Sequence, residues 1–149
     1  MNIYIDADAC PVKDETLKVA ERYNLPVFVV SNGGMRPSRD PRITNIIVPK
    51  TPDAADDWIA ERLERDDIVV TQDIPLAARA LEVGSLPLGP SGKVFTEQTI
   101  GMALAVRELN QHIREASNIQ TRHAGFTARD RSTFLQALDR LVVGAQKAN

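Results

Sequence analysis

The sequence has few of the residues on which several kinds of functional site depend. One cysteine and two histidines occur among its 149 residues, which excludes an internal disulfide and argues against a zinc centre of cysteine and histidine. Aromatic residues make up only 5%, too few for an extended platform that stacks nucleic-acid bases. No apolar run approaches the roughly 20 residues that span a bilayer. The opening residues turn acidic too early for a secretion signal, so we expect a cytoplasmic protein without a membrane segment.

Charge is balanced overall but is unevenly distributed. The formal net charge is −2, so no overall positive field attracts nucleic acid. Eight acidic and two basic side chains lie between Asp53 and Asp73, whereas the stretch from Gly34 to Lys50 holds four basic and one acidic. An acidic block that follows a basic loop fits solvated helix faces as well as a functional surface, and both interpretations stay open.

Short apolar segments alternate with amphipathic ones along the chain. We expect strands over residues 2–6, 27–30, 43–48, 67–71 and 85–88. Proline and hydroxyl residues at favourable first positions predict helices that begin near Pro11, Thr51, Pro75, Thr96 and Thr127. This order predicts a single α/β domain over residues 1–149, a three-layer sandwich around a mostly parallel sheet with additional C-terminal helices. Residues from about 144 to 149 are expected to be disordered.

Three carboxylates come from segments that this fold brings to one edge of the sheet. Asp6 and Asp73 each follow an apolar strand, and Asp56 lies in the first turns of the preceding helix, which runs antiparallel to the strands. Carboxylates that approach one another repel unless a cation lies between them. The pattern therefore predicts a site for Mg²⁺ or Mn²⁺, which prefer oxygen ligands and activate water. Taken singly, Asp56 and Asp8 are better explained as helix caps, whereas Asp6 and Asp73 resist that explanation.

Several segments resemble a known family of bacterial proteins. The opening Tyr4-Ile5-Asp6-Ala7-Asp8-Ala9-Cys10-Pro11-Val12 is similar to that of the uncharacterised YaiI/YqxD family, as are residues 52–59, 70–77 and 129–131. The family in turn resembles PIN-like domains, metal-dependent nucleases that cut RNA. Asp56-Asp57-Trp58-Ile59-Ala60 is similar to the Asp-x-x-Ile-Ala helix start of those domains, and Thr71-Gln72-Asp73 to their Thr-x-Asp turn. Asp6 takes the place of their first-strand aspartate.

The resemblance implies roles for individual residues. Asp6, Asp56 and Asp73 would act as metal ligands and catalytic residues, with Asp57 as a further ligand and Asp8 as a further catalytic residue. PIN domains usually carry another acid in an intervening helix. This chain has no clean counterpart, so Asp8 or Asp57 would have to substitute. The implied activity is that of a Mg²⁺- or Mn²⁺-dependent phosphodiesterase or ribonuclease, with the natural substrate and the oligomeric state left open.

Other residues suggest how a phosphate-containing substrate such as RNA would be held. Arg36, Arg39 and Arg42 could steer a phosphate backbone toward the acidic edge. Asn32 could bind phosphate or a metal-bound water, although acceptance of a left-handed turn is the favoured interpretation. Thr71 belongs to the Thr-x-Asp turn and is counted with the substrate-binding residues. Arg129-Asp130-Arg131 is better explained as a salt-bridge network than as a phosphate grip.

Two other functions remain as alternatives. The chain could be a non-catalytic module that binds RNA or a nucleotide. Asp6-Ala7-Asp8 also resembles the Asp-x-Asp of phosphatases in which the first aspartate is the nucleophile, although lysines are sparse here. Cys10 lies at a helix start, where a thiol pKa can be lowered, but a small residue at a tight turn is the favoured explanation.

Overall fold

The computed structural model describes residues 1–7, 10–33, 39–51, 53–102, 105 and 126–148. In these residues five strands form one sheet in the order β3-β2-β1-β4-β5. Every neighbouring pair is parallel, which confirms the predicted α/β class. The strands are β1 (Ile3–Asp6), β2 (Val27–Ser31), β3 (Ile43–Ile47), β4 (Ile68–Val70) and β5 (Leu86–Leu88).

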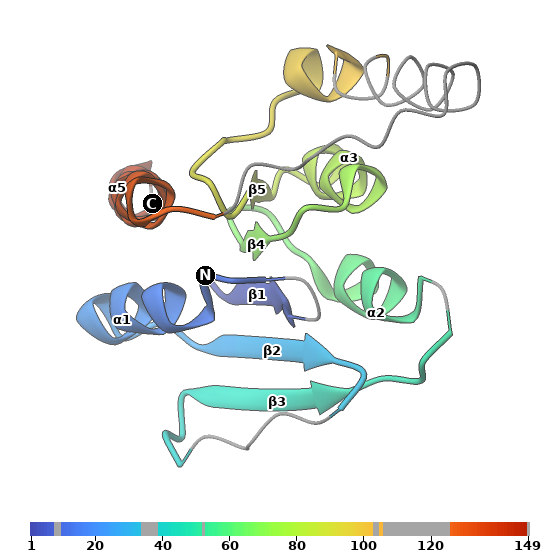
Figure 1. Ribbon diagram of the computed structural model, residues 1–149, viewed down its shortest axis with the longest axis horizontal. Helices are drawn as coiled ribbons and strands as arrows, with labels where there is room; N and C mark the ends of the chain where they lie inside the picture. The colour runs from blue at the N-terminus through green and yellow to red at the C-terminus, as the bar shows by residue number, and fades with distance from the viewer. Residues whose placement is uncertain (8–9, 34–38, 52, 103–104, 106–125, 149) are drawn as a thin grey trace.

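Helices cover both faces of the sheet. Figure 1 shows α1 and α5 on one side of it and α2 and α3 on the other, so the expected three layers are present. A further helical segment spans residues 97–102. The named helices are α1 (Lys13–Tyr23), α2 (Ala54–Arg62), α3 (Ile74–Glu82) and α5 (Ala128–Ala148).

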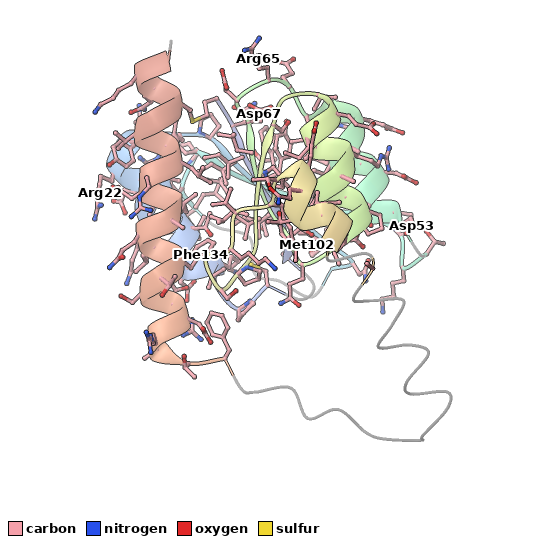
Figure 2. The ribbon with its side chains drawn as sticks, turned by 90° about the horizontal axis from the view of Figure 1, so that it is seen from above. Arg22, Asp53, Arg65, Asp67, Met102 and Phe134 are labelled. Carbon is pink, nitrogen blue, oxygen red and sulfur yellow. The ribbon has the colours of Figure 1, made fainter. Side chains whose placement is uncertain are left out.

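The inner strands β1, β2 and β4 are largely apolar because both of their faces are buried, whereas the edge strand β3 has no buried residue. Ile3 and Ile5 of β1 belong to the core beneath α1 and α5, to which α5 contributes Phe134 and Leu138. Figure 2 shows Phe134 directed from α5 toward the sheet. Tyr4, between the two isoleucines, packs instead in the core beneath α2 and α3. Successive side chains of a strand point to opposite faces, so a continuous apolar run supplies two cores.

Two of the predicted helix starts are wrong in detail. Pro11 lies outside α1, which begins at Lys13 after Val12. Thr51 does not cap α2: the N-cap is Asp53, whose φ of 67° is left-handed and whose side chain makes no capping hydrogen bond. The left-handed turn at Asp53 therefore moves the start of α2 past the threonine.

The predicted hydroxyl caps are confirmed for the helices that begin after Thr96 and Thr127. Thr127 Oγ1 accepts from Asp130 N at 3.1 Å, and Asp130 Oδ2 accepts in return from Thr127 N at 3.0 Å. Thr96 Oγ1 likewise accepts from Thr99 N at 3.2 Å. Reciprocal bonds of the first kind form a capping box, which fixes the start of α5.

The last described helix extends into the segment for which the sequence predicts disorder. α5 continues through Ala148. Val142 and Ala145 are buried, so the apolar stripe that holds α5 on the sheet extends into this segment. Residue 149 lies outside the described residues. Within the described part of the chain, no helix has the length and apolar character needed to cross a membrane.

Candidate functional site

The carboxyl ends of β1 and β4 form the topological switch point of the sheet. From β1 the chain continues to β2 on one side, whereas β3 is followed by β4 on the opposite side of β1. Open α/β sheets bind ligands at such points, because the connections leave in opposite directions and open a crevice. A pocket of about 340 Å³ lies here, lined by Asp6, Cys10, Thr71, Gln72, Asp73, Ile74 and Pro90.

Thr71 links the two predicted aspartates within this pocket. Its buried hydroxyl donates to Asp6 Oδ2 at 2.9 Å and accepts from the backbone N of Asp73, also at 2.9 Å. A hydroxyl can donate once while it accepts, so one side chain fixes both the Asp6 carboxylate and the turn that carries Asp73. Thr71 therefore acts on the carboxylates directly, in addition to lining the pocket.

Asp73 has a structural duty as well as a place in the pocket. Its Oδ1 accepts from Leu76 N at 2.9 Å, which makes Asp73 the N-cap of α3. The sequence reasoning favoured a capping role for Asp56 and not for Asp73, and the structure reverses this assignment. The cap orients the Asp73 carboxyl group at the pocket wall.

Asp56 lies in the first turn of α2 beside the other two carboxylates. Burial raises the pKa of its carboxyl group to about 7, and a hydrogen bond with Asp73 and the negative charges of Asp73, Asp6 and Asp53 add to this. A raised carboxyl pKa beside other carboxylates is the expected consequence of like charges that share a site. Asp6 and Asp73 thus line one pocket, and Asp56, from a third segment, lies near enough for their charges to act on its carboxyl group.

The remaining predicted metal ligands are placed differently. Asp57 forms an ion pair with Arg79 at 2.7 Å on the exposed surfaces of α2 and α3. Asp8 lies outside the described residues. In the part of the chain that the structure describes, no three histidine, cysteine, aspartate or glutamate side chains are grouped closely enough to hold a metal ion.

The loop whose arginines are predicted to steer phosphate ends away from the carboxylate pocket. Arg42 lies at the amino edge of the sheet, because its carbonyl accepts from the N of Val27, the first residue of β2. Its guanidinium makes two bonds to Asp40, at 2.9 and 3.2 Å. Arg39 is exposed three residues earlier, on the part of the loop that leads to this edge, and Arg36 lies outside the described residues. The cause is geometric: a loop between parallel neighbours must return along the whole sheet.

Asn32 follows β2 at the carboxyl edge, as predicted, and is exposed. The left-handed backbone expected for Asn32 falls instead on Gly33, with a φ of 112°. Glycine adopts this conformation without steric cost, so the asparagine is not required for the turn.

Cys10 lines the pocket but is not an activated nucleophile. Burial raises the pKa of its thiol to about 11, with smaller contributions from the charges of Asp6 and Glu15. The thiol therefore stays protonated at neutral pH, which supports the explanation of Cys10 as a small residue at a turn. Arg131, predicted to belong to a salt-bridge network, pairs with Glu15 at 3.0 Å and donates to Pro11 O at 2.9 Å.

The sequence reasoning did not find Pro90, which closes the pocket from the turn after β5. The available signal was the pairing of β5 with β4, because it places the residues after β5 beside Asp73. Fold and site together define a doubly wound parallel α/β protein with an acidic pocket at its switch point.

Comparison with known proteins places the chain in a family. Residues 4–144 match the family described as uncharacterised BCR, YaiI/YqxD family. The chain belongs to the YaiI/YqxD family. Among solved structures, none matches it.

Curated relatives cover nearly the whole chain. It is 57% identical over 146 residues to the UPF0178 protein mlr0875 of Mesorhizobium japonicum, a match that covers 98% of this chain and 94% of the relative. The UPF0178 protein R01393 of Rhizobium meliloti is 58% identical over 139 residues, with 93% and 95% covered. The UPF0178 protein Rru_A0086 of Rhodospirillum rubrum is 51% identical over 148 residues, with 99% of each chain covered.

Proposed function

We propose that this protein is a metal-dependent phosphodiesterase that acts on RNA, with Asp6, Asp56 and Asp73 as ligands of Mg²⁺ or Mn²⁺. The observation that carries the proposal is the convergence of these three carboxyl groups at the switch point, where the neighbouring charges help to raise the pKa of Asp56 to about 7. Strongly perturbed carboxyl groups in a pocket are more typical of functional sites than of structural ones. The similarity of the Asp6, Asp56 and Thr71-Gln72-Asp73 segments to PIN-like domains supports the same choice.

The chemistry of the donors fits a hard divalent cation. All three side chains offer carboxylate oxygens, which Mg²⁺ and Mn²⁺ prefer. Because the described residues provide no ready grouping of three ligands, the carboxyl groups must move closer together before they can share an ion, and Asp56 must bind it in the deprotonated form. When bound, the ion would supply a hydroxide at neutral pH and stabilise phosphoryl charge.

The chain's own residues would fix the geometry of this site. Thr71 holds Asp6 through the 2.9 Å bond to Oδ2. The α3 cap holds Asp73 through Oδ1. Two ligands that are oriented by bonds outside the metal shell are typical of sites in which binding depends on preorganisation. In this proposal Asp56 is the ligand that responds to the ion.

Calorimetric titration with Mn²⁺ tests the metal site. We expect the wild type to bind and the double variant Asp6→Asn, Asp73→Asn to bind at least about tenfold more weakly, since each substitution removes a charged ligand. Asp66→Asn is the matched control, because it removes one negative charge near the start of β4 and keeps a residue that tolerates the φ of 70° found there. Equally weak binding by the wild type and the double variant would show that the proposal is wrong.

Incubation with RNA separates catalysis from binding. Mn²⁺-dependent cleavage that is lost in Asp73→Asn supports the phosphodiesterase. Retention of RNA without cleavage, weakened by salt, supports the non-catalytic module instead. That alternative is favoured by the absence of a ready three-ligand group among the described residues.

The phosphatase alternative makes a different prediction. Its nucleophile would be Asp6, and a phosphate monoester would leave an acid-stable, hydroxylamine-sensitive phosphoryl group on that residue. Detection of this adduct would replace the phosphodiesterase proposal.

A further inference from the structure

Three basic side chains reach the carboxyl edge of the sheet from separate parts of the chain. Lys13 is the first residue of α1, Lys93 lies in the turn after β5, and Arg129 is the second residue of α5. These are not the arginines of the loop before β3, for which the sequence predicts phosphate binding. Arg42 of that loop lies at the amino edge of the sheet, away from the pocket.

The direction of α5 brings Arg129 to this edge. Near its start, Arg131 bonds to Pro11 O and Glu15, at the beginning of α1. Eight residues later, Asp139 bonds to Arg22 and Tyr23, at the end of α1. The two helices therefore run side by side in the same direction. Because α1 leaves the carboxyl end of β1, the first turn of α5 lies at that same edge.

A close contact brings Lys93 to the start of α5. Gly92 packs against Thr133 so tightly that a Cβ on the glycine would approach the threonine backbone to 2.8 Å. Thr133 lies four residues after Arg129 and so belongs to the same face of the helix. Lys93 directly follows Gly92, and Pro90 of the same turn lines the carboxylate pocket. Lys93 and Arg129 thus flank the pocket on the side of α5.

These three cations differ from the basic residues that hold parts of the fold together. Arg22, Arg42, Arg79 and Arg131 each form an ion pair. Within the described residues, Lys13, Lys93 and Arg129 form none, and Lys93 and Arg129 are exposed. Their charge is not used to hold the fold together, so it is available to an anion.

We propose that Lys13, Lys93 and Arg129 form a binding surface for the phosphate backbone of a single-stranded polynucleotide, beside the carboxylate pocket. As the substrate surface of an RNA-cleaving site it rests on the proposed function, but its binding needs neither metal nor turnover. Cations that contact phosphates position a strand without reading its bases, so the surface is independent of sequence. Cations on one side of an acidic pocket also offset the repulsion between phosphates and carboxylates.

Fluorescence anisotropy with a labelled 12-nucleotide oligouridylate in EDTA tests the surface without cleavage. We expect Lys93→Gln and Arg129→Gln each to weaken binding about three- to tenfold, and the triple variant with Lys13→Gln to weaken it at least thirtyfold. The slope of log affinity against log salt should fall by about 0.7 for each phosphate contact removed. The conservative variants Lys93→Arg and Arg129→Lys should retain wild-type binding, which separates loss of charge from loss of fold.

Arg65→Gln is the matched control, since this arginine is exposed and lies toward the opposite edge; Figure 2 shows Arg65 at the same end of the molecule as Asp67. This variant should bind as the wild type does. Wild-type affinity in the triple variant, an equal loss in the control, or no binding by the wild type would each overturn the surface.

Two further arms identify the ligand and separate this proposal from the metal site. A DNA oligonucleotide of the same length should compete, whereas uridine monophosphate at equal phosphate concentration should not; equal competition by the mononucleotide would overturn the polynucleotide assignment. If RNA binding depends on the three cations but no Mn²⁺-dependent cleavage is found, the binding surface is supported and the phosphodiesterase proposal is wrong. If the triple variant cleaves RNA with an unchanged KM, the phosphodiesterase is supported and the binding surface is wrong.

Discussion

The two ends of the sheet use aspartate in opposite ways. At the amino end, buried Asp67 accepts backbone N–H groups from Asn2 on one oxygen and from Glu64 on the other, both at 2.9 Å. Asp40 is held by Arg42, which keeps the pKa of its carboxyl group below the usual range. Both carboxylates thus have hydrogen-bond partners that tie loops to strands.

At the carboxyl end, Asp6, Asp56 and Asp73 lie near one another. Within the described residues neither Asp56 nor Asp73 forms an ion pair, and Asp56 is held in a partly protonated state. Like charges placed together oppose folding, and proteins retain them mainly where function requires it. The comparison teaches that the partners of an aspartate, and not its presence, distinguish a structural end from a functional one.

Removal of Asp67 should have the largest effect on stability. In Asp67→Asn an amide NH₂ replaces one acceptor and faces a backbone N–H, so we expect the free energy of unfolding to fall by about 2–3 kcal/mol. Urea denaturation measures this, with Asp66→Asn as a control expected to change little. Mn²⁺ binding should stay the same in both variants. A loss of Mn²⁺ affinity in Asp67→Asn would contradict the distinction between the two ends of the sheet.

Substitution of Asp56 should change the free energy of unfolding in the opposite direction from substitution of Asp67. Because its pKa is about 7 in the folded protein and about 4 in the unfolded chain, the folded state binds the proton more tightly. The free energy of unfolding should therefore decrease as pH rises from about 4 to 7. Asp56→Asn should flatten this dependence and be more stable than the wild type at pH 8 by about 1–2 kcal/mol, a partial value because the group is partly solvated. Parallel pH profiles for the two proteins would contradict the assignment.

Thr71→Val tests the link between Asp6 and Asp73. It removes both bonds of the hydroxyl, but the pocket admits water to the Asp73 N–H, so we expect a loss of only about 1 kcal/mol. If the bonds position the carboxylates, Mn²⁺ affinity should fall several-fold in Thr71→Val and recover in Thr71→Ser. Equal affinity in the two variants would limit Thr71 to a packing role.

Asp57→Asn should have the smallest effect. Its ion pair with Arg79 joins two exposed side chains, and such pairs contribute less than about 1 kcal/mol. We expect a change below about 0.5 kcal/mol in thermal or urea denaturation and unchanged Mn²⁺ binding. A marked loss of metal affinity would restore Asp57 to the ligand set that the sequence suggested.

Features that follow from hydrophobic periodicity and from the ends of strands could be predicted from the sequence. Asp6 and Asp73 could be found because each follows a buried apolar strand, and parallel strands end at one edge. The position of Arg42 could not, because nearness in sequence to Asn32 conceals the length of sheet that the loop must cross. The start of α2 could not be predicted either, because it depends on the left-handed turn at Asp53, a backbone conformation that composition does not reveal.

The place of α5 has a consequence for biosynthesis. During synthesis β1, at the centre of the sheet, emerges well before α5, the helix that contributes Phe134, Leu138 and Val142 to its core. Until α5 has emerged, the apolar side of β1 lacks this cover and is open to chaperones and to aggregation. Closure of this core therefore waits for α5, and nascent chains stalled before it should be selectively degraded.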